Sequence, residues 1–117
     1  MDTTEAVEAL AALAQPTRLE AMRHLVSLEP HGAAAGEIAR AAGVPQNTMS
    51  THLAVLNRAG LVDGERQGRS IIYRARLDRF RSIVGYLLQD CCGGRPELCA
   101  ALIDDLTPCC SPEETTA

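Results

Sequence analysis

The segment from His31 to Arg58 constrains this chain most, because it holds two helical patterns separated by only three residues. A short helix is expected around residues 37–42, and Gly43 suits the left-handed position that ends a helix. Pro45 suits the first turn of a second helix, expected over about residues 45–58. A short helix, a three-residue turn and a longer helix together predict a helix-turn-helix unit.

The second of these helices has two chemically different faces. Met49, Leu53 and Leu56 follow the i, i+4, i+7 spacing of a stripe that faces a core. The opposite face is short and polar, as in a helix that lies in a major groove, although exposed helix starts also carry such residues as caps. His52 lies near the buried edge and is predicted to be structural. The candidate DNA-binding residues of this helix are Gln46, Asn47, Thr48, Ser50, Thr51 and Arg58, with Ala54 among them on the same face.

An arginine-rich hairpin is expected directly after this helix. Residues 61–66 and 70–75 are two β-prone runs joined by a turn at residues 67–69. Residues 58–81 hold seven arginines and three acids, in a chain whose net charge is −4. Such a local basic segment is the electrostatic footprint of a nucleic-acid surface, although a solvated arginine face would look similar. The hairpin places positive charge beside the helix at Arg66, Arg69, Arg74 and Arg76, of which Arg66 and Arg69 are the candidate DNA contacts.

Composition favours one mainly α-helical domain. The chain has 117 residues, 46% of them hydrophobic and only 3% aromatic, which is low for an all-β fold. Helical spacing also appears before the helix-turn-helix, around residues 7–14 and 19–26. The first residues are acidic, unlike a secretory leader, and no apolar run approaches the roughly 18 residues of a membrane span. We therefore expect a cytoplasmic protein with reduced thiols.

Three segments in order resemble the ArsR (ArsR/SmtB) family of winged-helix repressors. They are AQPTRLEAMRHL at residues 14–25, the pattern SxHLxxLxxAGLV at residues 50–62, and the GR hairpin tip at residues 68–69. The resemblance covers about residues 5–90 and implies a mainly α winged helix-turn-helix with a β-hairpin wing. It further implies a homodimer that binds a palindromic operator in double-stranded DNA and leaves it when a toxic metal or metalloid binds.

The resemblance leaves the sensor position to be found, because family members differ in it. A Cys-x-Cys motif in the helix before the recognition helix is one arsenic site of the family, but residues 33–43 contain no cysteine. Zinc sensors use Asp, His and Glu on the last helix, and residues 77–89 contain no histidine. That last helix has an apolar stripe that needs a partner surface, expected to be a second subunit: Phe80, Ile83, Val84, Leu87 and Leu88.

Cysteines cluster after the last helix, where another arsenic-sensing branch of the family carries its ligands. Gly93-Gly94 allows the chain to reverse, and a short helix opened by Pro96 would bring Cys99 back to Cys91 and Cys92. Three soft thiolates suit trivalent arsenic, whereas structural zinc normally takes four ligands. Buried small hydrophobes and a redox switch are the alternatives. Cys109 and Cys110 are candidate auxiliary ligands.

The sequence therefore predicts a non-enzymatic, As(III)-responsive repressor with Cys91, Cys92 and Cys99 as the metal site. No Ser/His/Asp set, phosphate loop or paired acid motif for catalysis is present. We expect a DNA-binding and dimerisation domain over residues 1–107, which includes a sensor segment at about 89–107, and a flexible tail at 108–117. Antimonite, methylated As(III) and other soft metals such as Cd or Zn remain open as inducers.

Overall fold

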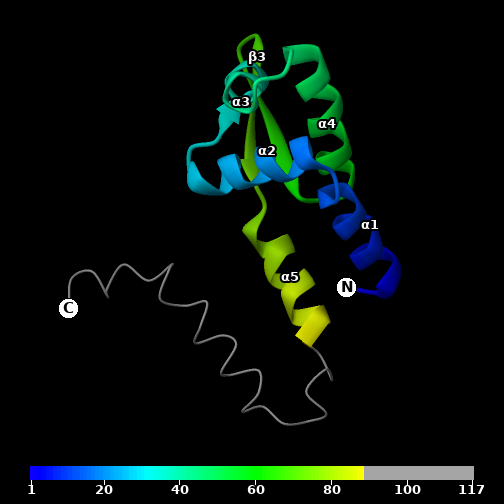
Figure 1. The fold of residues 1–117 in the computed structure, drawn as a ribbon. Coiled ribbons are helices and arrows are strands. Elements are labelled where there is room, and N and C mark those ends of the chain that lie inside the picture. Colours follow the sequence, from blue (N-terminus) through cyan, green and yellow to red (C-terminus); the bar gives the residue numbers. More distant parts are fainter. Residues whose placement is uncertain (89–117) are drawn as a thin grey trace, which may run out of the picture. The chain divides into compact units, whose positions relative to one another are not determined.

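The computed structural model describes residues 1–88, as five helices and a three-stranded antiparallel sheet within that part of the chain (Figure 1). Residues 1–84 form one compact unit. The mainly helical fold with a β-hairpin is thus as expected. In chain order the elements are α1 (Thr3–Leu13), α2 (Pro16–Ser27), β1 (Ala33–Ala34), α3 (Ala35–Ala42), α4 (Gln46–Arg58), β2 (Val62–Gln67), β3 (Ser70–Ala75) and α5 (Leu77–Leu88).

Local signals in the sequence explain where the helices begin and end. Asp2 and Glu5 form a reciprocal capping box at the start of α1. The Gln15 side chain accepts from the Arg18 amide at 2.8 Å, and Pro16 occupies the first turn of α2. Gly43 ends α3 in the left-handed conformation with φ 73°, as predicted. These boundaries leave a short turn between α3 and α4.

The core lies between the helix-turn-helix and the sheet. The predicted stripe of α4 is confirmed, since Met49, Leu53 and Leu56 are each 0% exposed. Around it pack the other large buried side chains, which come from α2, α3 and the start of β2: Met22, Leu25, Ile38, Leu61 and Val62. Burying large apolar side chains is the main favourable term in the folding of a domain of this size. The core therefore fixes α4 firmly with its polar face outward.

The N-terminal helix buries a different face from the one its large residues suggest. Ala6, Ala9 and Ala12 face the core, whereas Val7 is 57% exposed and Leu10 is 41% exposed. Alanines allow α1 to lie close to α2 and α4. The two larger side chains consequently remain at the surface of the described part of the chain.

The sheet contains one strand that the sequence did not predict. β3 pairs with β2 from Val62 opposite Ala75 to Gln67 opposite Ser70, so the hairpin turn has two residues, Gly68 and Arg69, and not three. The other edge of β3 pairs with β1, in a sheet order of β1-β3-β2. Two alanines carry no strand pattern, and this pairing joins segments far apart in the chain. It attaches the hairpin to the start of α3.

Candidate nucleic-acid interface

The outer face of α4 is polar and fully accessible. All six candidate residues on this helix are exposed, as is Ala54 between them. Asn47 Oδ1 accepts from the Thr48 amide at 2.9 Å, and the Thr51 hydroxyl donates to the Asn47 carbonyl at 3.2 Å. These local bonds occupy one acceptor and one donor, which leaves the amide NH₂ of Asn47 and the lone pairs of Thr51 for another molecule. The face can therefore offer both donors and acceptors to base edges.

Half-buried polar contacts of Arg18 connect α4 with the two N-terminal helices. Arg18 Nε donates to the Ala12 carbonyl at 2.6 Å, and Arg18 Nη1 lies 3.4 Å from His52 Nδ1. Because a guanidinium can only donate, Nδ1 of His52 is the acceptor in this contact. His52 is half-buried beside Arg18, in line with its expected place near the buried edge of α4. Arg18 was not recognised from sequence, since its partner lies 34 residues away.

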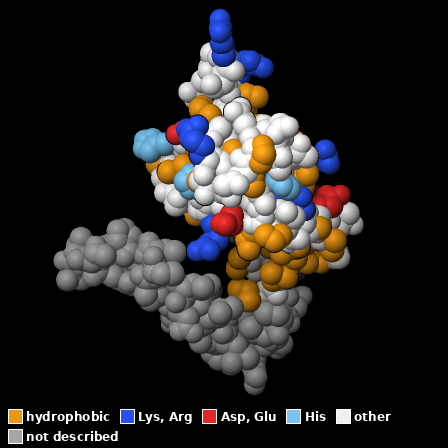
Figure 2. Space-filling model, turned by 45° about the horizontal axis from the view of Figure 1, so that its top comes forward, with side chains coloured by type: hydrophobic (Ala, Val, Ile, Leu, Met, Phe, Trp, Pro, Cys, Tyr) orange, Lys and Arg blue, Asp and Glu red, His pale blue; other side chains and the backbone are white. Residues whose placement is uncertain are grey.

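The hairpin lies beside α4 (Figure 1), and basic side chains gather at the end of a protrusion of the molecule (Figure 2). Arg66 and Arg69 are exposed, and Gly68 forms the turn with φ 66°. Two guanidinium groups at the end of a protruding ribbon can reach phosphate oxygens without moving the core. The structure thus places both candidate hairpin residues where a wing would carry them.

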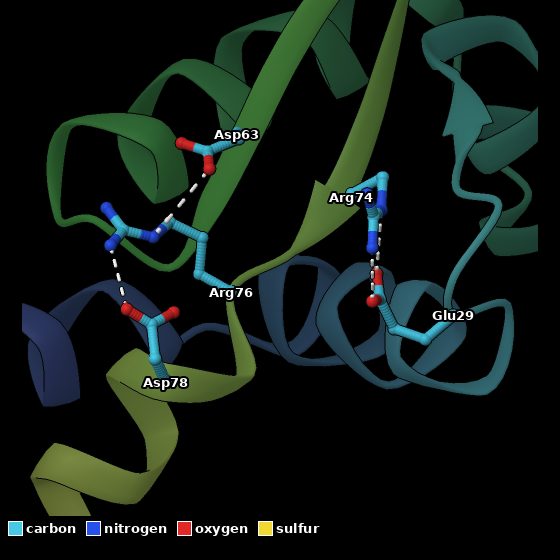
Figure 3. A network of polar contacts seen from close by, with 5 residues as sticks. All are labelled: Glu29, Asp63, Arg74, Arg76 and Asp78. Atoms are coloured by element: carbon cyan, nitrogen blue, oxygen red, sulfur yellow. Dashed lines mark hydrogen bonds and ion pairs between the residues drawn. The ribbon is translucent and has the colours of Figure 1, made fainter.

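The other two arginines of the hairpin form ion pairs within the chain, which the charge pattern of the sequence does not reveal (Figure 3). Arg74 donates to Glu29 at 2.9 Å, and Arg76 donates to Asp78 at 2.9 Å while its Nε lies 3.7 Å from Asp63. The bond from Arg76 holds the pKa of the Asp78 carboxyl below its ordinary value of 3.8. Their acidic partners neutralise Arg74 and Arg76, so the free positive charge is at the tip.

The predicted sensor residues lie outside the described part of the chain. This applies to Cys91, Cys92, Cys99, Cys109 and Cys110, to the sensor segment at 89–107 and to the tail at 108–117. Residues 1–88 contain no cysteine, and among them no three His, Cys, Asp or Glu side chains gather as a metal site. Any thiol chemistry of this protein consequently belongs to residues after α5.

Comparison with known proteins agrees with this architecture. Residues 13–65 match a helix-turn-helix domain family. The transcriptional repressor SmtB of Mycobacterium tuberculosis is 41% identical over 67 residues, which is 57% of this chain and 47% of that protein. The chain therefore spans about half the length of that curated relative. The transcriptional regulator YgaV of Escherichia coli is 31% identical over 83 residues, which is 71% of this chain and 82% of YgaV.

Solved structures give the same fold. One is the homodimeric winged helix-turn-helix DNA-binding domain of Mb0332 from Mycobacterium bovis, described as a possible ArsR-family regulator, with TM-score 0.60 and 28% identity over 74% of this chain and 81% of that one. The chain belongs to the ArsR/SmtB family. A second structure, described as a possible transcriptional regulator for arsenical resistance, has TM-score 0.58 and 29% identity over 68% of this chain and 83% of its own.

Membership in the ArsR/SmtB family assigns names to the elements already described. α3 and α4 form the helix-turn-helix, α4 is the recognition helix, and β2 with β3 forms the wing. None of the helices in residues 1–88 is both long and apolar enough to cross a lipid bilayer.

Proposed function

We propose that this chain is a transcriptional repressor that binds operator DNA as a homodimer and is released by As(III). The observation that carries the DNA-binding part is the pairing of an exposed Asn and Thr face on α4 with a wing tip that bears Arg66 and Arg69. This arrangement separates groups that can read bases from groups that can position the protein on phosphates. The kinship with SmtB and YgaV supports the same role.

Dimerisation is supported by apolar side chains that residues 1–84 leave uncovered. Val7 and Leu10 on α1 are 57% and 41% exposed, and Leu77 and Val84 on α5 are 49% and 44% exposed. A second copy of the chain would cover such surfaces through a self-complementary, two-fold contact. A dimer would also present two recognition helices to the two halves of a palindromic site.

The inducer is proposed from the chemistry of the thiols. Cys91, Cys92 and Cys99 follow α5 directly, and three thiolates match the ligand demand of trivalent arsenic. The similarity to a structure described as a possible regulator for arsenical resistance supports this choice. Because Arg79 of α5 lies against Gly60 at the end of α4, a centre bound after α5 would act on an element that touches this helix end.

The decisive experiment follows DNA release and arsenic coordination together. A duplex is first selected by the reduced wild-type protein from a randomised library, and its binding is measured by fluorescence anisotropy during titration with arsenite. We expect release, with an X-ray absorption spectrum that shows three sulfur ligands around arsenic. Linkage requires the selected duplex to weaken arsenite binding by the same factor. Arsenite that binds without changing DNA affinity would contradict the sensor proposal.

Cysteine variants test the assignment of ligands. Cys91→Ser, Cys92→Ser and Cys99→Ser should each keep DNA binding and lose most of the arsenite response. The matched control replaces both Cys109 and Cys110 by Ser and should respond normally. If the Cys109/Cys110 double variant does not respond to arsenite while Cys99→Ser does, the arsenic site lies in the tail. Release by peroxide but not by arsenite would favour a redox regulator.

Two substitutions test the division of labour on DNA. Arg69→Ala should weaken binding to the selected and scrambled duplexes alike and reduce the salt slope by about 1, because it removes one phosphate contact. Asn47→Ala should instead change the preferred base at one position. A wild-type salt slope in the Arg69 variant would show that the wing tip does not touch DNA.

A further inference from the structure

Arg79, in the first turns of α5, lies across the end of the recognition helix. Its side chain covers Gly60, the residue that turns the chain after α4: Nε and Cζ lie 3.1 Å and 3.4 Å from the position that a Cβ on Gly60 would take. The Nε atom is buried and has no hydrogen-bond partner within the described residues. An arginine whose Nε is buried without an acceptor is unusual enough to need a physical explanation.

The surface under Arg79 is the C-terminal turn of α4. Gly60 has φ 81°, its amide donates to Asn57 at 2.9 Å, and the Leu61 amide donates to Leu56 at 2.9 Å. This Schellman turn closes the helix but leaves its last carbonyls without donors inside the helix. Such a helix end carries partial negative charge, so a guanidinium placed over it is favourable.

The same turn receives the start of α5. The Arg76 amide donates to the Leu61 carbonyl at 2.9 Å, where β3 passes into α5. Arg79 therefore adds a contact between α5 and the chain that leaves the recognition helix, next to the one that the Arg76 amide makes just before α5. The backbone contact ties the two segments at one point, and the contact of Arg79 with Gly60 can set the angle between them.

We propose that Arg79 is a positioning residue for operator recognition, through which α5 sets the orientation of α4. The inference rests on the proposed DNA-binding function and does not depend on arsenic. In this structure the Nε–H of Arg79 makes no hydrogen bond within the described residues. A small movement of α4 on DNA can bring a carbonyl oxygen from the end of this helix within hydrogen-bond distance of that Nε–H. Operator binding and the position of α5 are then linked, since both act on one contact.

The test compares two arginines of the same helix in the full chain. Arg79→Met removes the guanidinium and keeps an unbranched apolar stem, and Arg81→Met, at an exposed position, removes the same charge. Affinities for the selected duplex and a scrambled duplex are measured at one salt concentration, with a thermal melt of each variant. We expect Arg79→Met to lose roughly tenfold in affinity for the selected duplex, the size expected for a hydrogen bond from a charged group. On the scrambled duplex it should change no more than Arg81→Met.

Two further variants separate positioning from charge and from folding. Arg79→Lys keeps the charge without the Nε–H and should remain weaker than wild type on the selected duplex. Gly60→Ala inserts a methyl group under the guanidinium, and adding Arg79→Met to it should cause little further loss of discrimination, because both changes act on one contact.

Three results would overturn the inference. They are equal losses in Arg79→Met and Arg81→Met on both duplexes, a lower melting temperature in Arg79→Met with unchanged affinity, and full recovery by lysine. A wild type that does not discriminate between the duplexes contradicts the proposed function as well. Discrimination that is kept in Arg79→Met contradicts this inference alone.

Discussion

The helices α4 and α5 are of similar length, and both are amphipathic. Within the described chain, however, only the apolar stripe of α4 is fully covered by other residues. Every member of the α4 stripe is fully buried within the same domain. In α5, Ile83 is buried at 4% exposure, whereas Leu77 and Val84 remain nearly half exposed. An apolar stripe therefore indicates that a helix needs a partner surface, without showing whether that surface lies in the same subunit. The packing of α4 is complete within its own domain, whereas α5 keeps apolar side chains at the surface of residues 1–84.

The strongest test of this contrast is a cavity in α4. Leu53→Ala should destabilise the domain by about 2–5 kcal/mol, because it deletes a fully buried side chain from a packed core. The free energy of unfolding can be measured by urea denaturation at a fixed protein concentration. Thr51→Ala, on the exposed face of the same helix, should change it by less than about 0.5 kcal/mol. Equal effects of the two variants would mean that α4 is not anchored by its stripe.

The corresponding change in α5 should act on association. Val84→Ser removes apolar surface that is 44% exposed, and each substitution occurs twice in a two-fold contact. We expect the dimer dissociation constant to rise by roughly tenfold or more, as measured by sedimentation equilibrium, with an unchanged helical CD spectrum. Ser82→Ala on the same helix serves as the control. Unchanged self-association in Val84→Ser would remove α5 from the dimer interface.

Substitution of two glycines tests whether the contact of α5 with the end of α4 affects the stability of the domain. Gly43→Ala and Gly60→Ala both place a side chain at positive φ, 73° and 81°, which costs about 1 kcal/mol. Gly43 faces open space, but a methyl group at Gly60 meets Arg79. Gly60→Ala should therefore be more destabilising by about 0.5 kcal/mol in thermal or urea unfolding. This excess should disappear in an Arg79→Ala background, which removes the side chain above Gly60, and an excess that persists there would mean that Arg79 does not cause it.

The smallest effect concerns the ion pair at the start of α5. The hydrogen bond from Arg76 lowers the pKa of Asp78, so the folded state favours the ionised carboxylate. Its contribution to stability is present above the ordinary value of 3.8 and is lost as the pH falls through the lower pKa of the folded state. The stability difference between wild type and Asp78→Asn should follow that course in urea titrations from neutral to acid pH. It should shrink in about 1 M salt, since the pair is exposed.

Residues close in sequence made much of the fold predictable. Four local features are as expected: the end of α3 at Gly43, the buried stripe of α4, the exposed face with Asn47 and Thr51, and the hairpin with Arg66 and Arg69 near its turn. Each feature follows from a local rule. Glycine tolerates positive φ, side chains on one face of a helix recur every 3.6 residues, and those on one face of a strand recur every two residues until a turn. The positions of the candidate DNA-binding residues needed no further information.

Contacts across long sequence separations were decided by the tertiary structure. Only the folded chain shows that β1 pairs with β3, that Arg74 and Arg76 are held by acids, and that Arg18 supports His52. The same holds for Arg79, whose contact with Gly60 joins two elements through a turn that local patterns describe separately. Which helix faces are apolar can be read from the amino-acid sequence, because amphipathic periodicity is local. Which of those faces and charges find partners within the same domain can be read only from the folded chain, because pairing depends on distances between segments that no local pattern encodes.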